Sequence, residues 1–366
     1  MSLEEDLQKS RTRSSIPKSD FLSSGSTLLN LACSGMPDCA IFKGGYFWGC
    51  GDSSSGKTML MLTLLAEAAK NKNWDGYDLF YDDVENGALM DFGKFFGKKM
   101  QERVKAPHKS EDGHDVFSAT AEEFYYVLDD KLTAVEKKKA RPFIYVLDSM
   151  DALSTKYEAK KFQQAKKAYE GETDAAGSFG DGKAKQNSTN LRVVVSRLRD
   201  TGCVLIILSQ TRDNVDGGMF EPKSVTSGGR ALKFYASLQL WTSPGPKLTK
   251  TVNGVDRQIG ITSRIAIKKN RLTGKEWTVE IPIYHSYGID DIGSCVDFLV
   301  KEKRWKAADK GKGNISATEL GLEGKRDFII QSIEEQDLQF DLKGLVEETF
   351  RDVEAACDLG RKPKYD

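Results

Sequence analysis

The sequence has little of what zinc centres, secreted frameworks and membrane spans require. Only 3 of its 366 residues are histidine and its 6 cysteines form no CxxC pair, so a zinc site is not expected. No apolar run approaches the roughly 20 residues that a spanning helix needs, and the first residues contain no hydrophobic signal core. Most cysteines lie in apolar runs, which is typical of buried thiols in a reducing compartment. We therefore expect a cytoplasmic protein without membrane contact. The cysteines are Cys33, Cys39, Cys50, Cys203, Cys295 and Cys357.

A net charge is also missing, because 54 basic and 54 acidic side chains balance to +0. This excludes a protein that is held to nucleic acid or a membrane by bulk charge, so any polyanion must bind a local patch. With 39% hydrophobic and 30% charged residues, the composition suits a folded chain rather than a disordered one. The length allows one large domain and a small one.

Strand and helix patterns alternate through the first two thirds of the chain, which predicts an α/β domain with a mostly parallel, twisted sheet flanked by helices. Two of the expected strands are continuous apolar runs, as in strands buried on both faces. The strands are expected at 45–49, 78–82, 143–147 and 203–208, and the helices at 57–70, 87–104, 119–138 and 189–200. Further strands, which could extend the sheet as an antiparallel edge, are expected at 232–241, 261–268 and 277–284.

Changes in composition divide the chain into three parts. Residues 1–20 are polar and are predicted to form a short N-terminal arm. Residues 21–285 are predicted to form the α/β core, and residues 286–366 a small C-terminal α-rich module. Within the core, the stretch 155–188 is rich in Lys, Gly, Ala and Ser, which predicts a segment that includes a mobile loop.

A complete phosphate-loop motif follows the first expected strand and opens a helix. The glycines allow backbone N–H groups to point at phosphate oxygens, and the helix N-terminus adds partial positive charge. The lysine of this motif neutralises the β- and γ-phosphates, and its hydroxyl residue holds Mg²⁺. The motif G-x-x-x-x-G-K-[ST] is matched by Gly51, Asp52, Ser53, Ser54, Ser55, Gly56, Lys57 and Thr58.

Polar residues end the neighbouring strands, where ligands of such sheets bind. Asp148 is expected to anchor Mg²⁺ directly or through water; capping of a helix is the alternative. Hydrolysis needs a carboxylate that orients water, for which Glu85 is the candidate and Asp83 the second choice. Gln210 could hydrogen-bond the γ-phosphate and report its presence to the following loop.

These segments, in this order, resemble the RecA family of ATP-dependent homologous recombinases, as a divergent member of bacterial or phage type. The likeness runs from about Ser23 to Lys303. It is strongest at Thr226-Ser227-Gly228-Gly229-Arg230-Ala231-Leu232-Lys233-Phe234-Tyr235-Ala236-Ser237, with support from Ser54-Ser55-Gly56-Lys57-Thr58 and Asp148-Ser149-Met150-Asp151-Ala152-Leu153.

The resemblance implies a P-loop ATPase core that uses ATP and Mg²⁺, with roles for single residues. Glu85 matches the catalytic glutamate, and Phe92 the aromatic residue that packs against adenine. Gln210 matches the glutamine that couples the γ-phosphate to DNA binding. Lys269 and Arg271 match two cations that reach the ATP of a neighbouring subunit, with Arg in place of the second Lys.

The resemblance also implies two DNA-binding segments, at about 169–188 and 211–229. Lys185, Ser188 and Arg192 fall on family positions that contact the DNA backbone, where cations and hydroxyls neutralise phosphates. For the lysines near 156–167, which alternate with acidic and apolar residues, a solvated linker is the favoured interpretation. The second segment holds Arg212, the wedge candidates Met219 and Phe220, and the possible hinge Gly228-Gly229.

The leading hypothesis is a DNA-dependent ATPase that forms helical filaments on single-stranded DNA and promotes pairing and strand exchange with homologous duplex DNA. The alternatives are a ring-forming helicase or translocase on the same core, and a non-hydrolysing filament accessory protein. A small-molecule kinase that shares only the phosphate loop is a further alternative, for which the sequence offers no acceptor pocket.

Overall fold

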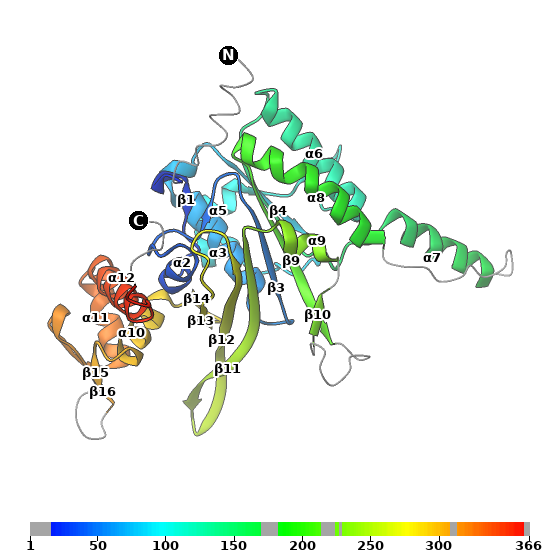
Figure 1. The fold of residues 1–366 in the computed structure, drawn as a ribbon. Coiled ribbons are helices and arrows are strands. Elements are labelled where there is room, and N and C mark those ends of the chain that lie inside the picture. The colour runs from blue at the N-terminus through cyan, green and yellow to red at the C-terminus, as the bar shows by residue number, and fades with distance from the viewer. Residues whose placement is uncertain (1–15, 170–181, 214–223, 227–228, 308–312, 362–366) are drawn as a thin grey trace, which may run out of the picture.

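The computed structural model describes residues 16–169, 182–213, 224–226, 229–307 and 313–361. A ten-stranded sheet lies at the centre of the molecule (Figure 1). Its strands are β3 (Tyr46–Gly51), β4 (Asp78–Asp83), β5 (Val104–Lys105), β8 (Phe143–Asp148), β9 (Val204–Asp213), β10 (Ser224–Thr226), β11 (Leu238–Val252), β12 (Val255–Asn270), β13 (Thr278–Tyr284) and β14 (Gly288–Ile289). Their order is β14-β13-β12-β11-β3-β9-β8-β4-β5, and β10 pairs with β9.

The sheet is parallel from β5 to β11 and antiparallel from β11 to β14. The α/β prediction is therefore confirmed, and the four expected core strands are β3, β4, β8 and β9. The expected antiparallel edge is wrong for β11, which runs parallel to β3 through the pairs Leu238–Phe47 and Thr242–Gly51. The antiparallel extension consists of β12, β13 and β14.

Helices cover both faces of the sheet. One face carries α2 (Thr27–Ser34), α3 (Lys57–Lys70), α4 (Phe92–Phe96) and α5 (Lys98–Arg103); the other carries α6 (Ala121–Glu136), α8 (Gly182–Thr201) and α9 (Arg230–Tyr235). Side chains of the central strands alternate between two cores: Phe47 faces the first, whereas Tyr46 and Trp48 face the second. This double burial explains the continuous apolar runs, because each fully buried large apolar side chain contributes about 1.5–3 kcal/mol.

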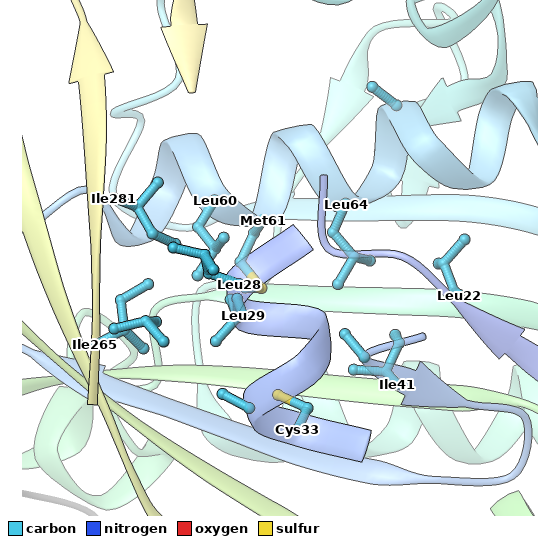
Figure 2. Packing of buried hydrophobic residues seen from close by; sticks show 14 of the residues in the cluster. Leu22, Leu28, Leu29, Cys33, Ile41, Leu60, Met61, Leu64, Ile265 and Ile281 are labelled. Carbon is cyan, nitrogen blue, oxygen red and sulfur yellow. The ribbon is translucent and has the colours of Figure 1, made fainter. Parts of the chain in front are cut away.

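The first core joins the helices to the antiparallel part of the sheet. Figure 2 shows Leu60 and Met61 of α3 beside Leu28 and Leu29 of α2. Ile265 of β12 and Ile281 of β13 belong to the same cluster. The packing places the first turn of α3, and therefore the phosphate loop, against the antiparallel strands.

Two predicted elements differ from the observed ones. The strand expected at 232–241 begins only at Leu238, because α9 occupies 230–235; its Leu232 is buried, and the carbonyl of Leu232 accepts a hydrogen bond from the Tyr46 hydroxyl at 3.1 Å. The helix expected at 87–104 is divided into α4 and α5 at Gly97, whose φ of +85° is incompatible with a continuous helix.

The Lys-rich stretch forms helices rather than a loop where it is described. Residues Lys156–Tyr169 form α7, which extends away from the sheet (Figure 1), and α8 begins at Gly182. The DNA-binding loop expected at about 169–188 is therefore helical at 182–188, whereas the prediction that 155–188 includes a mobile loop stays a prediction. Residues 170–181 lie outside the described residues.

The C-terminal segment contains both helices and a small sheet. It comprises α10 (Asp291–Lys301), α11 (Arg326–Glu335), α12 (Gln339–Ala356), β15 (Lys306–Ala307), β16 (Asn314–Ala317) and β17 (Leu322–Lys325). Val296 and Phe350 share one hydrophobic cluster with Leu29 of α2, and the carboxylate of Asp291 accepts hydrogen bonds from the Thr27 N–H and hydroxyl at 2.6 and 2.8 Å. A boundary at 286 stays a prediction.

Short elements complete the described chain. They are η1 (Lys18–Asp20), β1 (Phe21–Leu22), β2 (Ile41–Phe42), η2 (Lys72–Trp74), β6 (His108–Lys109), β7 (Asp115–Val116) and η3 (Thr318–Leu320). Within the described ranges, no helix is both long enough and apolar enough to cross a bilayer.

Candidate nucleotide site

The phosphate loop turns between the end of β3 and the start of α3, as the motif predicts. Gly51 is required by the close approach of β11: a Cβ at this position would lie 2.0 Å from the Thr242 hydroxyl oxygen. Gly56 has a φ of +89°, a conformation that side-chain-bearing residues rarely adopt. No side chain caps the N-terminus of α3. Its first N–H groups are therefore available to an anion.

Two residues, one from β11 and one from β12, contact the loop. The Ser55 and Thr242 hydroxyl oxygens lie 2.7 Å apart, and the Ser263 hydroxyl donates a hydrogen bond of 2.6 Å to the Ser55 carbonyl. Sequence reasoning missed Thr242 and Ser263. Each lies within an ordinary strand pattern, and only the sheet order places it beside the loop.

Lys57 is buried and its ammonium points back into the loop. Its Nζ atom donates to the carbonyls of Gly51 and Asp52 at 2.9 and 2.7 Å. Burial lowers the pKa of Lys57, and the nearby carboxylate of Asp148 opposes that shift. A buried cation ringed by carbonyls and by uncapped helix N–H groups has the chemistry of a phosphate site.

Thr58 and Asp148 meet beside the loop. The Thr58 hydroxyl and the Tyr81 hydroxyl each donate a 2.7 Å hydrogen bond to Oδ2 of Asp148. Burial raises the pKa of Asp148, and the negative charges of Glu85 and Asp83 add to the rise. A hydroxyl and a carboxylate side by side fit Mg²⁺, which takes few protein ligands and completes its shell with phosphate and water oxygens. Tyr81 was not recognised from the sequence.

The carboxylates of Asp83, the last residue of β4, and of Glu85 just beyond it occupy different environments. Asp83 is buried, and its two carboxylate oxygens accept the N–H groups of Gly87 and Ala88, each at 3.0 Å. Glu85 is exposed, and its Oε1 accepts hydrogen bonds from the Ser149 hydroxyl and, at 2.8 Å, from Nε2 of Gln210. Asp83 therefore stabilises a turn, whereas Glu85 faces the open edge of the sheet.

Comparison with known proteins points to one family. Residues 144–290 match the RecA N-terminal domain. The chain is 28% identical to protein RecA of Clostridium tetani over 285 residues, which is 75% of this chain and 69% of that relative. It is 28% identical over 258 residues to protein RecA of Clostridium beijerinckii, covering 69% of this chain and 60% of the relative. The domain match and these relatives support a divergent member of the RecA family.

The RecA-family match contains Asp148 and Gln210 but begins after the phosphate loop. The loop is therefore supported by its own geometry, independently of that match. Phe92, the predicted adenine neighbour, is half-buried at the start of α4 and packs edge-on against Phe96, with ring centroids 6.1 Å apart. Its role stays a prediction.

In this RecA-family chain, Lys269 and Arg271 do not contact their own phosphate loop. Lys269 Nζ donates to the carbonyls of Lys233 and Phe234 at 3.2 and 2.7 Å, and Arg271 donates to Phe234 at 3.0 Å. Burial lowers the pKa of Lys269, with a further contribution from the charge of Arg271. Both cations gather at the exposed end of α9, where the ring of Phe234 is 66% exposed.

The first group of predicted DNA contacts lies on a helix rather than on a loop. Lys185, Ser188 and Arg192 share one side of α8, at spacings of three and four residues. Lys185 and Arg192 are exposed, while Leu191 and Val194 of the same helix are buried. The reason is that α8 begins seven residues before the expected start at 189, and Lys183 and Asn187 in this added part are buried like Leu191 and Val194.

The second group is only partly described. Arg212 lies on β9 and pairs with Val225 of β10. Gly229 has a φ of +82°, and a Cβ on it would lie 2.8 Å from the Cβ of Ala184, so the start of α9 is pressed against α8. Met219, Phe220 and Gly228 lie outside the described residues.

Proposed function

We propose that this RecA-family chain is a DNA-dependent ATPase that assembles as a helical filament on single-stranded DNA. In that form it would promote pairing and strand exchange with homologous duplex DNA. The single observation that carries the proposal is the hydrogen bond of 2.8 Å between Glu85 and Gln210. Glu85 lies at the sheet edge that holds the phosphate loop, and Gln210 lies in β9. Residues 209–213 of β9 and 224–226 of β10 form the β9–β10 ribbon, so the bond connects this edge to the ribbon.

The roles of the nucleotide residues follow from their surroundings. Lys57, with the uncapped end of α3, would neutralise the phosphates of ATP; Thr58 and Asp148 would hold Mg²⁺. Glu85 is the candidate that orients and polarises water, because its carboxylate is exposed at the sheet edge while that of Asp83 is used by two backbone N–H groups. The bound nucleotide would supply the phosphoryl group that water attacks.

Gln210 is the candidate sensor. Its side-chain amide contacts Glu85, and its backbone N–H donates a 2.8 Å hydrogen bond to Oδ2 of Asp151. A movement of the Glu85 side chain is therefore transmitted to the base of the β9–β10 ribbon, where the second predicted DNA segment, which includes Arg212, begins. A ligand that binds one arrangement of this connection better than the other shifts its population.

Assembly would place Lys269 and Arg271 against the nucleotide of a neighbouring protomer. Within their own protomer, both cations donate hydrogen bonds to backbone carbonyls near Phe234, and Lys269 also lies over the Phe234 ring, 5.8 Å from its centroid. An exposed aromatic side chain beside two cations suits a protein interface. A head-to-tail contact that does not close generates a helical filament. Phosphate contacts from Lys185, Ser188 and Arg192 would hold DNA without reading its sequence.

Electron microscopy of the full chain with single-stranded DNA and a non-hydrolysable ATP analogue tests the proposal. We expect helical filaments that require both ligands, and none with Lys57→Ala. Closed rings would favour a translocase instead. A second measurement, phosphate release with and without single-stranded DNA, should show stimulation by DNA. A turnover rate that is the same with and without DNA would contradict the proposal. Filaments that form but do not hydrolyse ATP would favour an accessory protein.

A further inference from the structure

The phosphate loop also contacts β9 directly, next to Gln210. The hydroxyl of Thr211 donates a hydrogen bond to the side-chain carboxylate of Asp52, the second residue of the loop. Thr211 also pairs with Thr226 at the base of the β9–β10 ribbon. The contact therefore joins two segments 159 residues apart in the chain.

Asp52 is bonded at the same time to the lysine of the loop. Its backbone carbonyl accepts hydrogen bonds of 2.7 Å from Nζ of Lys57 and of 2.7 Å from the Ser55 hydroxyl. Lys57, Asp52 and Thr211 thus form a continuous chain of contacts, in which the backbone of Asp52 faces the buried ammonium and its side chain faces the ribbon.

This chain of contacts depends on what else the ammonium binds. An ammonium group has three donors and no acceptor, so an anion in the loop competes with the Asp52 carbonyl for Lys57. When that carbonyl loses its charged donor, the peptide of Asp52 is less restrained. The carboxylate of the same residue then transmits this movement to Thr211, from whose hydroxyl it accepts a hydrogen bond.

Charge gives a second reason to expect movement at Asp52. The carboxylate contributes to the electrostatic field at Lys57, and it has the same sign as a phosphate group. Asp52 is exposed, and like charges close together repel there as well, although less than in the interior, so an anion in the loop favours an orientation of Asp52 that differs from the one held by Thr211.

We propose that Asp52 and Thr211 are positioning residues that transmit the state of the phosphate loop to the β9–β10 ribbon and so set its affinity for single-stranded DNA. The inference rests on the proposed function and deepens it, because it adds a connection that runs through the loop itself, beside the one through Glu85 and Gln210. It acts on coupling rather than on the chemical step.

The test compares Thr211→Val, which keeps the shape but lacks the hydroxyl, with Thr211→Ser, which keeps the hydroxyl. Fluorescence anisotropy of a labelled oligothymidylate gives the DNA affinity of the full chain, without nucleotide and with adenylyl imidodiphosphate and Mg²⁺. The ratio of the two affinities is the coupling factor. Thr211→Val should change this factor by about tenfold, the effect of one hydrogen bond to a charged group, and Thr211→Ser should restore it.

A double-mutant cycle with Asp52→Ala, which removes both acceptor oxygens of the side chain, makes the test specific. The double variant should change the coupling factor no more than Thr211→Val alone, because both substitutions break one contact; additive effects would overturn the inference. A normal coupling factor in Thr211→Val, or loss of coupling in Thr211→Ser, would also overturn it. Absence of any nucleotide dependence in the wild type would refute the proposed function as well, whereas a normal wild type with an inert Thr211 refutes the inference alone.

Discussion

The two carboxylates at the end of β4 allow a prediction in which each substitution changes one observable. Asp83 accepts two backbone N–H groups, and Glu85 is exposed beside Ser149 and Gln210. Asp83→Asn should lower the free energy of unfolding, and Glu85→Gln should lower ATP turnover. A sequence pattern with two acidic residues in three positions does not separate these effects.

The magnitudes follow from the contacts. In Asp83→Asn, the amide oxygen can accept one N–H group, but the amide nitrogen faces the other and cannot accept it. Because a hydrogen bond to a charged group contributes about 1.5–3 kcal/mol, we expect a loss of about 2–3 kcal/mol of unfolding free energy. Glu85→Gln should stay within about 0.5 kcal/mol, as exposed substitutions generally do, and should lower turnover by about 100-fold or more, the usual contribution of a general base.

Two assays separate the outcomes. Urea denaturation followed by tryptophan fluorescence gives the unfolding free energy of each variant, and phosphate release with Mg²⁺, ATP and single-stranded DNA gives turnover under conditions where both variants are folded. The assignment is refuted if Asp83→Asn loses turnover at unchanged stability while Glu85→Gln retains it.

Three further predictions test stability, pH dependence and DNA binding. Arg103→Met should lower the free energy of unfolding by about 3 kcal/mol in urea denaturation, since its guanidinium donates to four backbone carbonyls at and beyond the end of α3. Lys99→Met, which removes only an exposed ion pair of the same helix, should cost less than about 1 kcal/mol. Equal losses would contradict a stabilising role of the four carbonyl contacts. Burial raises the pKa of Asp291 above 3.8, so the folded state binds its proton more tightly and the wild type should lose stability as the pH rises through the folded pKa. Asp291→Asn should flatten that part of the stability curve, and an unchanged slope would show that another group titrates. Phe220→Ala should weaken binding of single-stranded DNA in anisotropy measurements while basal phosphate release persists, and an unaltered DNA affinity would exclude a wedge.

The fold was predictable where the information is local. The apolar runs at 143–147 and 203–208 are buried on both faces, and period-two alternation between the two cores accounts for them. Prediction was poorer where an apolar run suits two conformations. The segment 232–241 starts as a helix because a turn with positive φ at Gly229 precedes it, and the packing of that glycine on Ala184 is not visible in the sequence.

The sequence by itself determined the phosphate loop, because glycine conformations, a helix start and a lysine at fixed spacing are properties of one short segment. Only the tertiary structure decided what surrounds the loop. Ser55 meets Thr242 and Ser263 across 187 and 208 residues of chain, and the contact of Glu85 with Gln210 spans 125 residues. Such pairs depend on strand order and register, which arise from the packing of the whole sheet rather than from the residues on either side of each partner.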